Sequence, residues 1–373
     1  MNTGNKRILF ILPLPPPVHG AAVVSQQIKD SVIINSGLDA DYVNLSTSRD
    51  VSEIGHTGLW LALKKSCRLV CIFFRTLYLL IVNRYDLCYI AMTCHGKGFL
   101  KDAPIALLCK LLGRKMVIHQ HNKGMSQDLN RPLYSKLFPL VYRNAGVILL
   151  SWQLYPDIQQ VVRREDVMVC PNGINLTCSG NAAIQSNGRP HLLFLSNLLE
   201  SKGVLVLLDA LRILKNRGND LVCNFIGGES KEIDATRFER EVLDRGLGEI
   251  VHYAGRRYGE EKEQFLKDSD IFVFPTFYYN ECFPLVILEA MQYSLPVITT
   301  REGGIPDIVI DGQTGILVEK NDPEALADAI VRLIDNPELA RQMGAAGRKR
   351  LEENFTERHF ETRFTDILHT LLS

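Results

Sequence analysis

Short apolar runs alternate with longer amphipathic stretches along the first half of the chain. The apolar runs predict strands, and the stretches between them predict helices. The predicted strands span residues 7–13, 40–45, 86–91, 115–120 and 146–151, and the predicted helices span residues 21–36, 59–83 and 99–112. Because strands that are separated by helices pair in parallel, this half predicts a parallel sheet with helices on both faces.

The same alternation returns in the second half of the chain. The predicted strands span residues 191–196, 221–226, 250–253, 271–275 and 296–299, and the predicted helices span residues 204–217, 260–267, 285–293 and 323–334. The pattern therefore predicts an α/β chain of two Rossmann-like, doubly wound parallel-sheet domains. We expect the two domains to face each other across a cleft, with ligands bound at the carboxyl ends of the strands.

A segment rich in Asn, Gly, Ser and Pro, PNGINLTCSGNAAIQSNGRP, separates the two patterns and is typical of a linker. We therefore predict a first domain over residues 1–178 and a second domain over residues 179–354. Residues 355–373 have the periodicity of an amphipathic helix, which we expect to pack back on the first domain.

The start of the chain imitates a secretory signal, because Lys6 and Arg7 precede an apolar run. That run is short and is broken by four prolines between residues 13 and 17, which favours a buried first strand that ends in a turn. The longest apolar run, residues 69–82, contains Arg75 and is too short to cross a bilayer.

Composition indicates a globular, reduced protein. Of 373 residues, 46% are hydrophobic and 23% are charged, which allows two packed cores and argues against disorder. The nine cysteines include no Cys-x-x-Cys pair, so neither a zinc site nor a redox motif is indicated. Free thiols in the cytoplasm are the plain interpretation.

The formal net charge is zero, but the charge is unevenly distributed. Residues 1–178 contain 20 Lys and Arg against 11 Asp and Glu, whereas the rest of the chain contains 22 against 31. A basic half indicates an anionic partner. A membrane surface or a phosphorylated lipid fits this charge, and no sequence motif indicates nucleic acid.

The predicted helix over residues 59–83 lies in a stretch, residues 54–85, that contains no acidic residue. Lys64, Arg68 and Arg75 fall within one narrow stripe of this otherwise apolar helix. A basic stripe of this kind is typical of a helix at a membrane surface, while a buried helix with one solvated edge has the same pattern. The basic first half favours peripheral contact with an anionic membrane.

The stretch NECFPLVILEAM, residues 280–291, places an acid just before a predicted helix and a second acid inside it. Pro284 suits a first helical turn, where its missing N–H costs nothing. The positive end of the helix would then present backbone N–H groups to an anion. These groups belong to Cys282, Phe283 and Leu285.

The two acids, Glu281 and Glu289, would lie on either side of this anion site. One carboxylate can accept hydrogen bonds from a ribose diol, and the other from the hydroxyls of a sugar. With phosphates between them, the arrangement suits a nucleotide-diphosphate sugar. Two glutamates also fall eight residues apart by chance, and Glu281 could simply favour the helix dipole.

A long run of the second half resembles the retaining, nucleotide-sugar-dependent enzymes of glycosyltransferase family 4. The resemblance covers most of residues 171–318 and includes PNGI, LFLSNLLESKGVLVLLDAL, FIGG, YAGRR and the run from SDIFVF to TGILV. It implies the GT-B fold of two Rossmann-like domains. It also implies that Glu281 contacts the donor sugar, that Glu289 binds the ribose hydroxyls and that Lys202 grips the diphosphate.

The chain departs from the family pattern at two places. Family members usually carry a Gly-Arg pair before the lysine, whereas this chain has Ser196 and Asn197. Either Arg256 or its neighbour Arg257 supplies the missing cation, or the donor binds more weakly. Cys282 stands where glycine is common, so its side chain needs room.

In the first half the resemblance implies a glycine-containing loop near the donor phosphate, at Gly20, and an active-site histidine at the end of a strand. Gly20 lacks any G-x-G-x-x-G fingerprint, so a simple strand-to-helix turn fits equally. His121 aligns best with the family histidine, and His119 is the alternative. A buried, hydrogen-bonded histidine is an equal explanation for either.

Asp268 and Asp270 imitate a metal-binding Asp-x-Asp pair, but Asp270 opens a predicted strand, which favours a structural role. We therefore expect no obligatory metal ion or cofactor, and a nucleotide-diphosphate sugar as co-substrate.

The sequence predicts a retaining hexosyltransferase that moves a sugar from this donor to a saccharide or lipid-linked saccharide. We expect it on the inner face of the bacterial cytoplasmic membrane, in surface polysaccharide or lipopolysaccharide assembly. Two other classes stay open: a non-hydrolysing sugar-nucleotide 2-epimerase, and a non-catalytic two-domain sugar-binding protein. No nucleic acid partner is expected.

Overall fold

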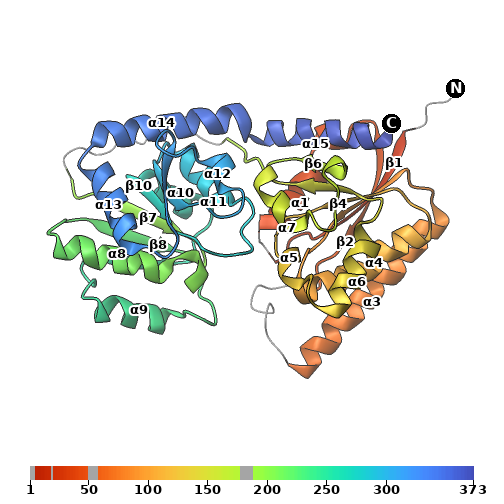
Figure 1. Ribbon diagram of the computed structural model, residues 1–373, viewed down its shortest axis with the longest axis horizontal. Coiled ribbons are helices and arrows are strands. Elements are labelled where there is room, and N and C mark those ends of the chain that lie inside the picture. The colour runs from red at the N-terminus through yellow and green to blue at the C-terminus, as the bar shows by residue number, and fades with distance from the viewer. Residues whose placement is uncertain (1–4, 18–19, 49–57, 177–187) are drawn as a thin grey trace. The chain divides into compact units, whose positions relative to one another are not determined.

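The computed structural model of the chain describes residues 5–17, 20–48, 58–176 and 188–373. It divides into two compact units (Figure 1): Met1–Asn172 with Arg358–Ser373, called unit 1 here, and Gly173–Glu357, called unit 2. The predicted domain boundary at residues 178 and 179 lies outside the described residues. Each unit contains a six-stranded parallel sheet, which confirms the predicted α/β class.

The sheet of unit 1 has the strand order β2-β1-β3-β4-β5-β6, and every neighbouring pair is parallel. Its strands are β1 (Lys6–Leu12), β2 (Leu38–Asn44), β3 (Leu87–Ala91), β4 (Met116–His119), β5 (Gly146–Leu149) and β6 (Val167–Val169). β1 lies between two other strands, and its side chains from Ile8 to Leu12 are fully buried. The first apolar run is therefore a core strand, as predicted.

The helices of unit 1 form between these strands. They are α1 (Gly20–Asp30), α2 (Val32–Asn35), α3 (Leu59–Val82), α4 (Gly96–Leu111), α5 (Met125–Asp128), α6 (Pro132–Tyr142), α7 (Tyr155–Ile158) and α15 (Glu357–Leu372). The prediction of one helix over residues 21–36 is wrong, because the chain breaks at Ser31. Its hydroxyl oxygen accepts a hydrogen bond from the N–H of Ile34 and so starts α2 as a new helix.

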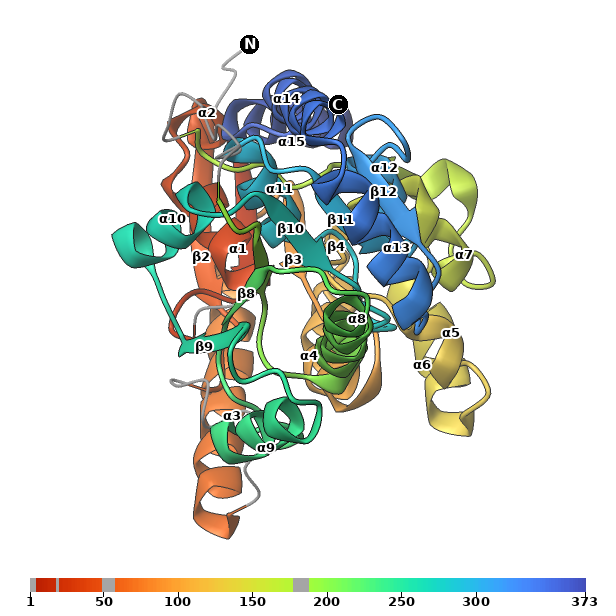
Figure 2. The same ribbon diagram turned by 90° about the vertical axis from the view of Figure 1, so that its left-hand side faces the viewer.

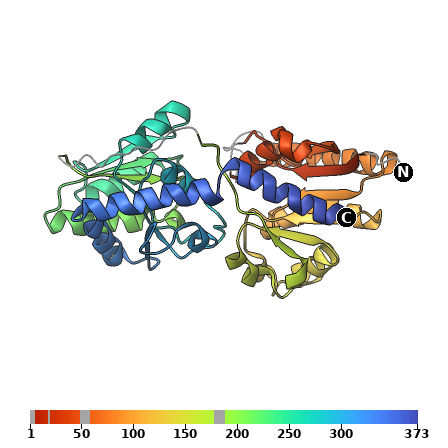
Figure 3. The ribbon, with the colours of Figure 1, turned by 90° about the horizontal axis from the view of Figure 1, so that it is seen from above.

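The last helix of the chain, α15, packs on the sheet of unit 1 (Figure 3). The ring centroid of Phe364 lies 5.3 Å from that of Tyr89 on β3, and Phe360 and Phe364 are fully buried. The Cys170 thiol donates to the carbonyl oxygen of Phe360. Residues from opposite ends of the sequence therefore share one core.

The sheet of unit 2 has the strand order β12-β11-β10-β7-β8-β9. Its strands are β7 (His191–Leu195), β8 (Val222–Ile226), β9 (Val251–Gly255), β10 (Ile271–Phe274), β11 (Val297–Thr300) and β12 (Gly315–Val318). Because the chain reverses direction of winding beside β7, the carboxyl ends of β7 and β10 meet at a topological switch point. In open parallel sheets this is where ligands bind.

Helices cover both faces of this sheet. They are α8 (Val204–Asn216), α9 (Ala235–Asp244), α10 (Gly259–Lys267), α11 (Leu285–Gln292), α12 (Ile305–Ile308), α13 (Pro323–Ile334) and α14 (Pro337–Asn354). Figure 2 shows α8 and α13 on one side of the strands and α11 and α14 on the other. Within the described part of the chain, no helix is both long and apolar enough to pass through a membrane.

Candidate active site

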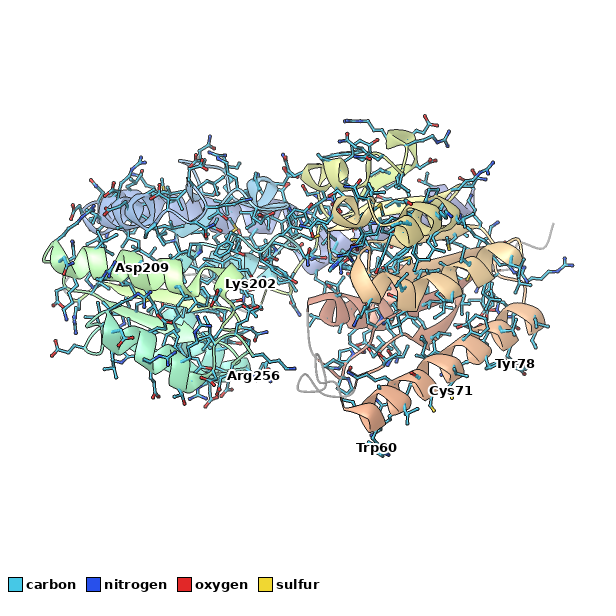
Figure 4. The ribbon with its side chains drawn as sticks, turned by 60° about the horizontal axis from the view of Figure 1, so that its bottom comes forward. Trp60, Cys71, Tyr78, Lys202, Asp209 and Arg256 are labelled. Carbon is cyan, nitrogen blue, oxygen red and sulfur yellow. The ribbon has the colours of Figure 1, made fainter. Side chains whose placement is uncertain are left out.

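Lys202 lies at the carboxyl edge of the unit 2 sheet, between β7 and α8 (Figure 4). It ends a single 3₁₀ turn, η4 (Glu200–Lys202), and Gly203 follows with a φ of +85°. A Cβ atom at Gly203 would lie 2.3 Å from the carbonyl oxygen of Pro275, so only glycine fits this position. The close approach of the two backbones holds Lys202 against the end of β10.

The ammonium group of Lys202 forms an ion pair with Glu281, with 2.5 Å between Nζ and Oε2. The two side chains are only 15% and 10% exposed. The same ammonium lies 4.4 Å from the ring centroid of Tyr278. An ion pair that is shielded from water and stacked on an aromatic face interacts strongly, and losing either partner leaves a buried charge unpaired.

The backbone around Glu281 is fixed by a loop that follows β11. Gly303, with a φ of +53°, approaches so closely that a Cβ atom would lie 2.1 Å from the carbonyl oxygen of Glu281. The N–H of Gly304 donates to the carbonyl oxygen of Cys282 over 2.6 Å. These contacts fix the backbone position of Glu281 and Cys282 relative to the loop after β11.

Glu302, in the same loop, is 3% exposed and was not predicted from the sequence as part of the site. Its carboxylate accepts hydrogen bonds from the N–H of Gly303 and from Nζ of Lys320, the latter over 2.5 Å. The signal in the sequence was the pair of glycines two residues after a strand, which indicates close backbone contact but not its partner.

Helix α11 begins at Leu285, so the N–H of Leu285 has no acceptor within the helix and lies at its positive end. Pro284 is the N-cap, with extended backbone angles, rather than a residue of the first turn as predicted. Cys282 and Phe283 are both buried. The Phe283 ring packs edge-on against Phe355, with 5.5 Å between centroids, so its side chain anchors the segment.

Glu289 lies one turn into α11 and pairs with Lys262 of α10, with 2.9 Å between Oε1 and Nζ. Both side chains are about a quarter exposed, so the pair is accessible to a ligand. The sequence gave no signal for Lys262, because it lies 27 residues away along the chain. The two acids predicted to bind donor hydroxyls each have a lysine partner.

Asn197 and Arg256 meet at Gly228, which follows β8. The N–H of Gly228 donates to Oδ1 of Asn197 over 3.1 Å, and a Cβ atom at Gly228 would lie 2.1 Å from Nε of Arg256. Arg257 instead reaches towards Glu261, at 3.9 Å. The structure therefore brings Arg256, rather than Arg257, beside the position where the family pattern lacks its arginine.

The two histidines of unit 1 lie at the end of β4, with 4.1 Å between their ring centroids. His119 is fully buried, and its Nδ1 lies 2.7 Å from the hydroxyl of Tyr89. Burial, together with the neighbouring His121 ring, lowers the pKa of His119 well below its usual 6.5. His121 is only partly buried, although its Nε2 is covered by protein.

The loop that carries His121 is held by Asp157. This buried carboxylate accepts hydrogen bonds from the N–H groups of Gly124, Met125 and Ser126. Gly20, in contrast, begins α1 at an exposed position where a Cβ atom would meet no protein atom within 4 Å. Protein packing therefore does not explain Gly20.

Asp270, the second acid of the Asp-x-Asp imitation, accepts a hydrogen bond from the N–H of His191 over 2.8 Å. It joins the starts of β7 and β10, at the opposite end of those strands from Lys202. This structural role therefore explains the acidic side chain of Asp270 without a ligand.

The comparisons with known proteins concern the sequence of unit 2 and the fold of the chain. Residues 182–350 match the family profile of Glycosyl transferases group 1. An uncharacterized glycosyltransferase of Methanocaldococcus jannaschii is 34% identical over 204 residues, which is 54% of this chain and 53% of that protein. A capsular polysaccharide biosynthesis glycosyltransferase, CapM, of Staphylococcus aureus is 28% identical over 179 residues, 48% of this chain and 46% of that protein.

Among solved structures, Anabaena Alr3699/HepE in complex with UDP-glucose matches 98% of this chain and 99% of its own, with a TM-score of 0.75 and 18% identity. The chain spans about half the length of the curated relatives it matches. Residues 182–350 thus match the profile of group 1 glycosyl transferases, and the two parallel-sheet units are those of the GT-B fold.

Proposed function

We propose that the chain is a retaining glycosyltransferase of the family 4 type, which transfers a sugar from a nucleotide-diphosphate donor to a saccharide or lipid-linked saccharide. The observation that carries the proposal is the ion pair of Lys202 and Glu281 at the carboxyl edge of a parallel sheet. It places one cation and one hydrogen-bond acceptor beside the N-terminus of α11. A diphosphate and the sugar attached to it need these two kinds of group next to each other.

The proposed step breaks the bond between the anomeric carbon of the sugar and the diphosphate oxygen. The bonding electrons stay on that oxygen, where the ammonium of Lys202 and the N–H groups at the start of α11 stabilise the new charge. The acceptor hydroxyl attacks the same face of the sugar, and its proton passes to the departing diphosphate. This route retains the anomeric configuration without a covalent sugar-enzyme intermediate.

The other predicted residues receive roles from their positions. Glu281 binds hydroxyls of the donor sugar when the diphosphate takes over Lys202, and Glu289 binds the ribose diol. Arg256 supplies the second cation for the diphosphate, beside Asn197. In unit 1 we assign Gly20 and His121 to the side of the reaction that meets the acceptor and the transferred sugar.

The proposal also covers the location of the enzyme in the cell and the class of its substrates. The name of the Staphylococcus relative refers to capsular polysaccharide, and the solved Anabaena structure holds UDP-glucose. These similarities support a nucleotide-sugar donor and a role in the assembly of a bacterial surface polysaccharide. We place the enzyme at the cytoplasmic face of the membrane, in peripheral contact with anionic lipid.

The test is transfer of labelled sugar from UDP-, GDP-, ADP- and dTDP-linked donors to acceptors in a membrane extract. With the donor that works, Lys202→Ala and Glu281→Ala should each lower kcat/KM by about 10²–10³, the usual loss when a group that stabilises the transition state is removed. Lys267→Ala is the matched control, since Lys267 is an exposed lysine of unit 2 whose partner is Glu263. It should keep nearly the full rate.

Four outcomes would contradict the proposal. Rates near wild type for both site variants would remove the assigned site. Conversion of the donor without any acceptor would indicate an epimerase, and tight donor binding without turnover would indicate a sugar-binding protein. NMR of the product settles the stereochemistry, because a product with the opposite anomeric configuration to the donor would exclude same-face attack.

A further inference from the structure

Helix α3 of unit 1 exposes an apolar face along almost its whole length. Seven large apolar side chains of this helix are between 52% and 73% exposed. We call them, together with the exposed Cys67 and Cys71, the α3 face. The seven are Trp60, Leu63, Val70, Phe74, Tyr78, Ile81 and Val82.

Apart from two adjacent pairs, Val70 with Cys71 and Ile81 with Val82, the members of the α3 face are three or four residues apart, so they lie on one side of the helix. Figure 4 shows Trp60, Cys71 and Tyr78 on the outer side of α3, pointing away from the rest of unit 1. With 24 residues at 1.5 Å each, the helix is about 36 Å long. An apolar strip of this length is far more than scattered surface apolar residues provide, and it indicates an interaction surface.

The opposite side of α3 packs on its own unit, and here the structure differs from the expected basic stripe. Thr76 and Leu80 are buried. Arg68 donates a 2.6 Å hydrogen bond to the carbonyl oxygen of Thr47, and Arg75 donates to that of Tyr42 on β2. The side chains turned outward are thus mainly the apolar ones, with the basic residues along the flanks.

Charge decides between the two occupants that such a face could have. Residues 54–85 contain no acid, while Lys64, Lys65, Arg68 and Arg75 are all on α3. Two copies of α3 packed face to face would bring these cations together with no opposite charge. An anionic lipid surface would instead neutralise the same cations while its acyl chains receive the apolar side chains.

We infer that α3 lies in the plane of an anionic lipid surface, with the α3 face inserted below the headgroups. This refines the membrane contact of the proposed function and rests on it. Lys64 lies 5.1 Å from the Trp60 ring centroid, so its stem can follow the aromatic ring while its ammonium stays at the headgroups. The aromatic rings of Trp60 and Tyr78 suit the boundary between headgroups and acyl chains.

The first experiment uses the native cysteines of the full chain. Cys67 and Cys71 are the exposed ones among the cysteines in the described residues, and Cys178, which lies outside them, is replaced by serine. The rate of labelling by an uncharged polyethylene-glycol maleimide is measured with and without vesicles of equal phosphatidylcholine and phosphatidylglycerol. We expect labelling to slow severalfold with vesicles, because the α3 face is then covered.

Two results of this experiment would overturn the inference. One is unchanged labelling in the presence of vesicles that sediment the protein, since another surface would then make the contact. The other is protection without lipid that grows with protein concentration, since a second copy of the chain would then cover the α3 face. Neither measurement needs donor or acceptor. The membrane inference can therefore fail while the proposed transferase activity stands, and the reverse.

The second experiment compares matched pairs of substitutions. Phe74→Gln with Ile81→Gln changes two side chains of the α3 face. Val32→Gln with Leu243→Gln changes two side chains that are 83% and 70% exposed elsewhere. Binding to the same vesicles should weaken at least about tenfold in the first variant and stay unchanged in the second.

All four positions are exposed, so both variants should melt within a few degrees of wild type. Equal binding by the two variants would overturn the inference, because the loss would then not depend on the α3 face.

Discussion

His119 is the residue whose protonation state depends most clearly on the fold. Its ring packs edge-on against Tyr89, at 5.9 Å between centroids, and lies 6.1 Å from the Phe364 ring. In this apolar setting burial, and secondarily the ring of His121, keeps the pKa of His119 well below 6.5. The histidine is therefore neutral in the folded chain at neutral pH and cannot serve as a general acid there.

The low pKa of His119 predicts how stability depends on pH. In the unfolded chain the ring binds a proton near pH 6.5, whereas in the folded chain it does not. The stability that His119 contributes is thus complete above pH 6.5. It is lost as the pH falls further, by about 1.4 kcal/mol for each pH unit until the folded pKa is reached.

His119→Gln keeps an acceptor for the Tyr89 hydroxyl but cannot titrate. We expect the free energy of unfolding of this variant, from urea titrations between pH 7.5 and pH 5, to fall less steeply with pH than that of wild type. His252→Gln removes an exposed histidine and should leave the wild-type slope unchanged. Identical slopes for all three proteins would contradict the buried neutral state.

The residues of the candidate site could be predicted where the local pattern at residues 280–291 or the family resemblance pointed to them. Glu281 and Lys202 were found in this way, and the structure joins them over 2.5 Å. Lys262 and Glu302 could not be found, because their ion-pair partners Glu289 and Lys320 lie on other elements of unit 2, and such pairs leave no periodic signal. The choice between Arg256 and Arg257 depended on side-chain direction, which adjacent positions in a sequence do not reveal.

At the scale of elements, the turn between η4 and α8 controls the position of Lys202. Gly203 combines a φ of +85° with a backbone contact that leaves no room for a Cβ atom. Gly218, at the other end of α8, has nearly the same φ, +84°, but no atom within 4 Å of a Cβ position. Substitution of Gly218 therefore measures the cost of backbone strain alone, whereas substitution of Gly203 measures that cost together with the cost of a steric clash.

Gly218→Ala should cost about 1–2 kcal/mol of unfolding free energy, the penalty of a left-handed conformation. Gly203→Ala should cost more, and it should also lower transferase activity because α8 and Lys202 must move away from Pro275. Urea titration and kcat/KM measured on both variants test this. Equal stability losses, or full activity in Gly203→Ala, would contradict the proposed contact.

Most elements could be predicted from the alternation of apolar runs, because ten of the twelve strands in the described residues coincide with such a run. β6 has only three residues, too few for a clear pattern, and β12, with four, was not predicted. The direction in which α3 faces could not be predicted either. Both its basic and its apolar residues recur at helical spacing, and only the partners of Arg68 and Arg75 in the structure decide which side turns inward.

At the scale of the whole molecule, the last helix links the end of the sequence to the first sheet. The aromatic cluster of Phe360, Phe364, Tyr89 and His119 is buried between α15 and the strands β3 and β4. An amphipathic pattern predicted the helix, which we expected to pack on the first domain, but periodicity does not say which strands of a sheet a helix covers. The stability of unit 1 therefore depends on residues that follow unit 2 in the sequence.

This dependence can be measured with one substitution in each unit. Phe364→Ala should destabilise unit 1 by about 3–5 kcal/mol, the usual cost of removing a fully buried phenylalanine. Phe272→Ala on β10, also fully buried, is the matched change in unit 2. In native-state hydrogen exchange, Phe364→Ala should lower the protection of backbone amides in β3 and β4 more than in β10 and β11. Phe272→Ala should do the opposite. Loss of protection only within α15 in Phe364→Ala would mean that the helix can detach while the sheet of unit 1 stays folded.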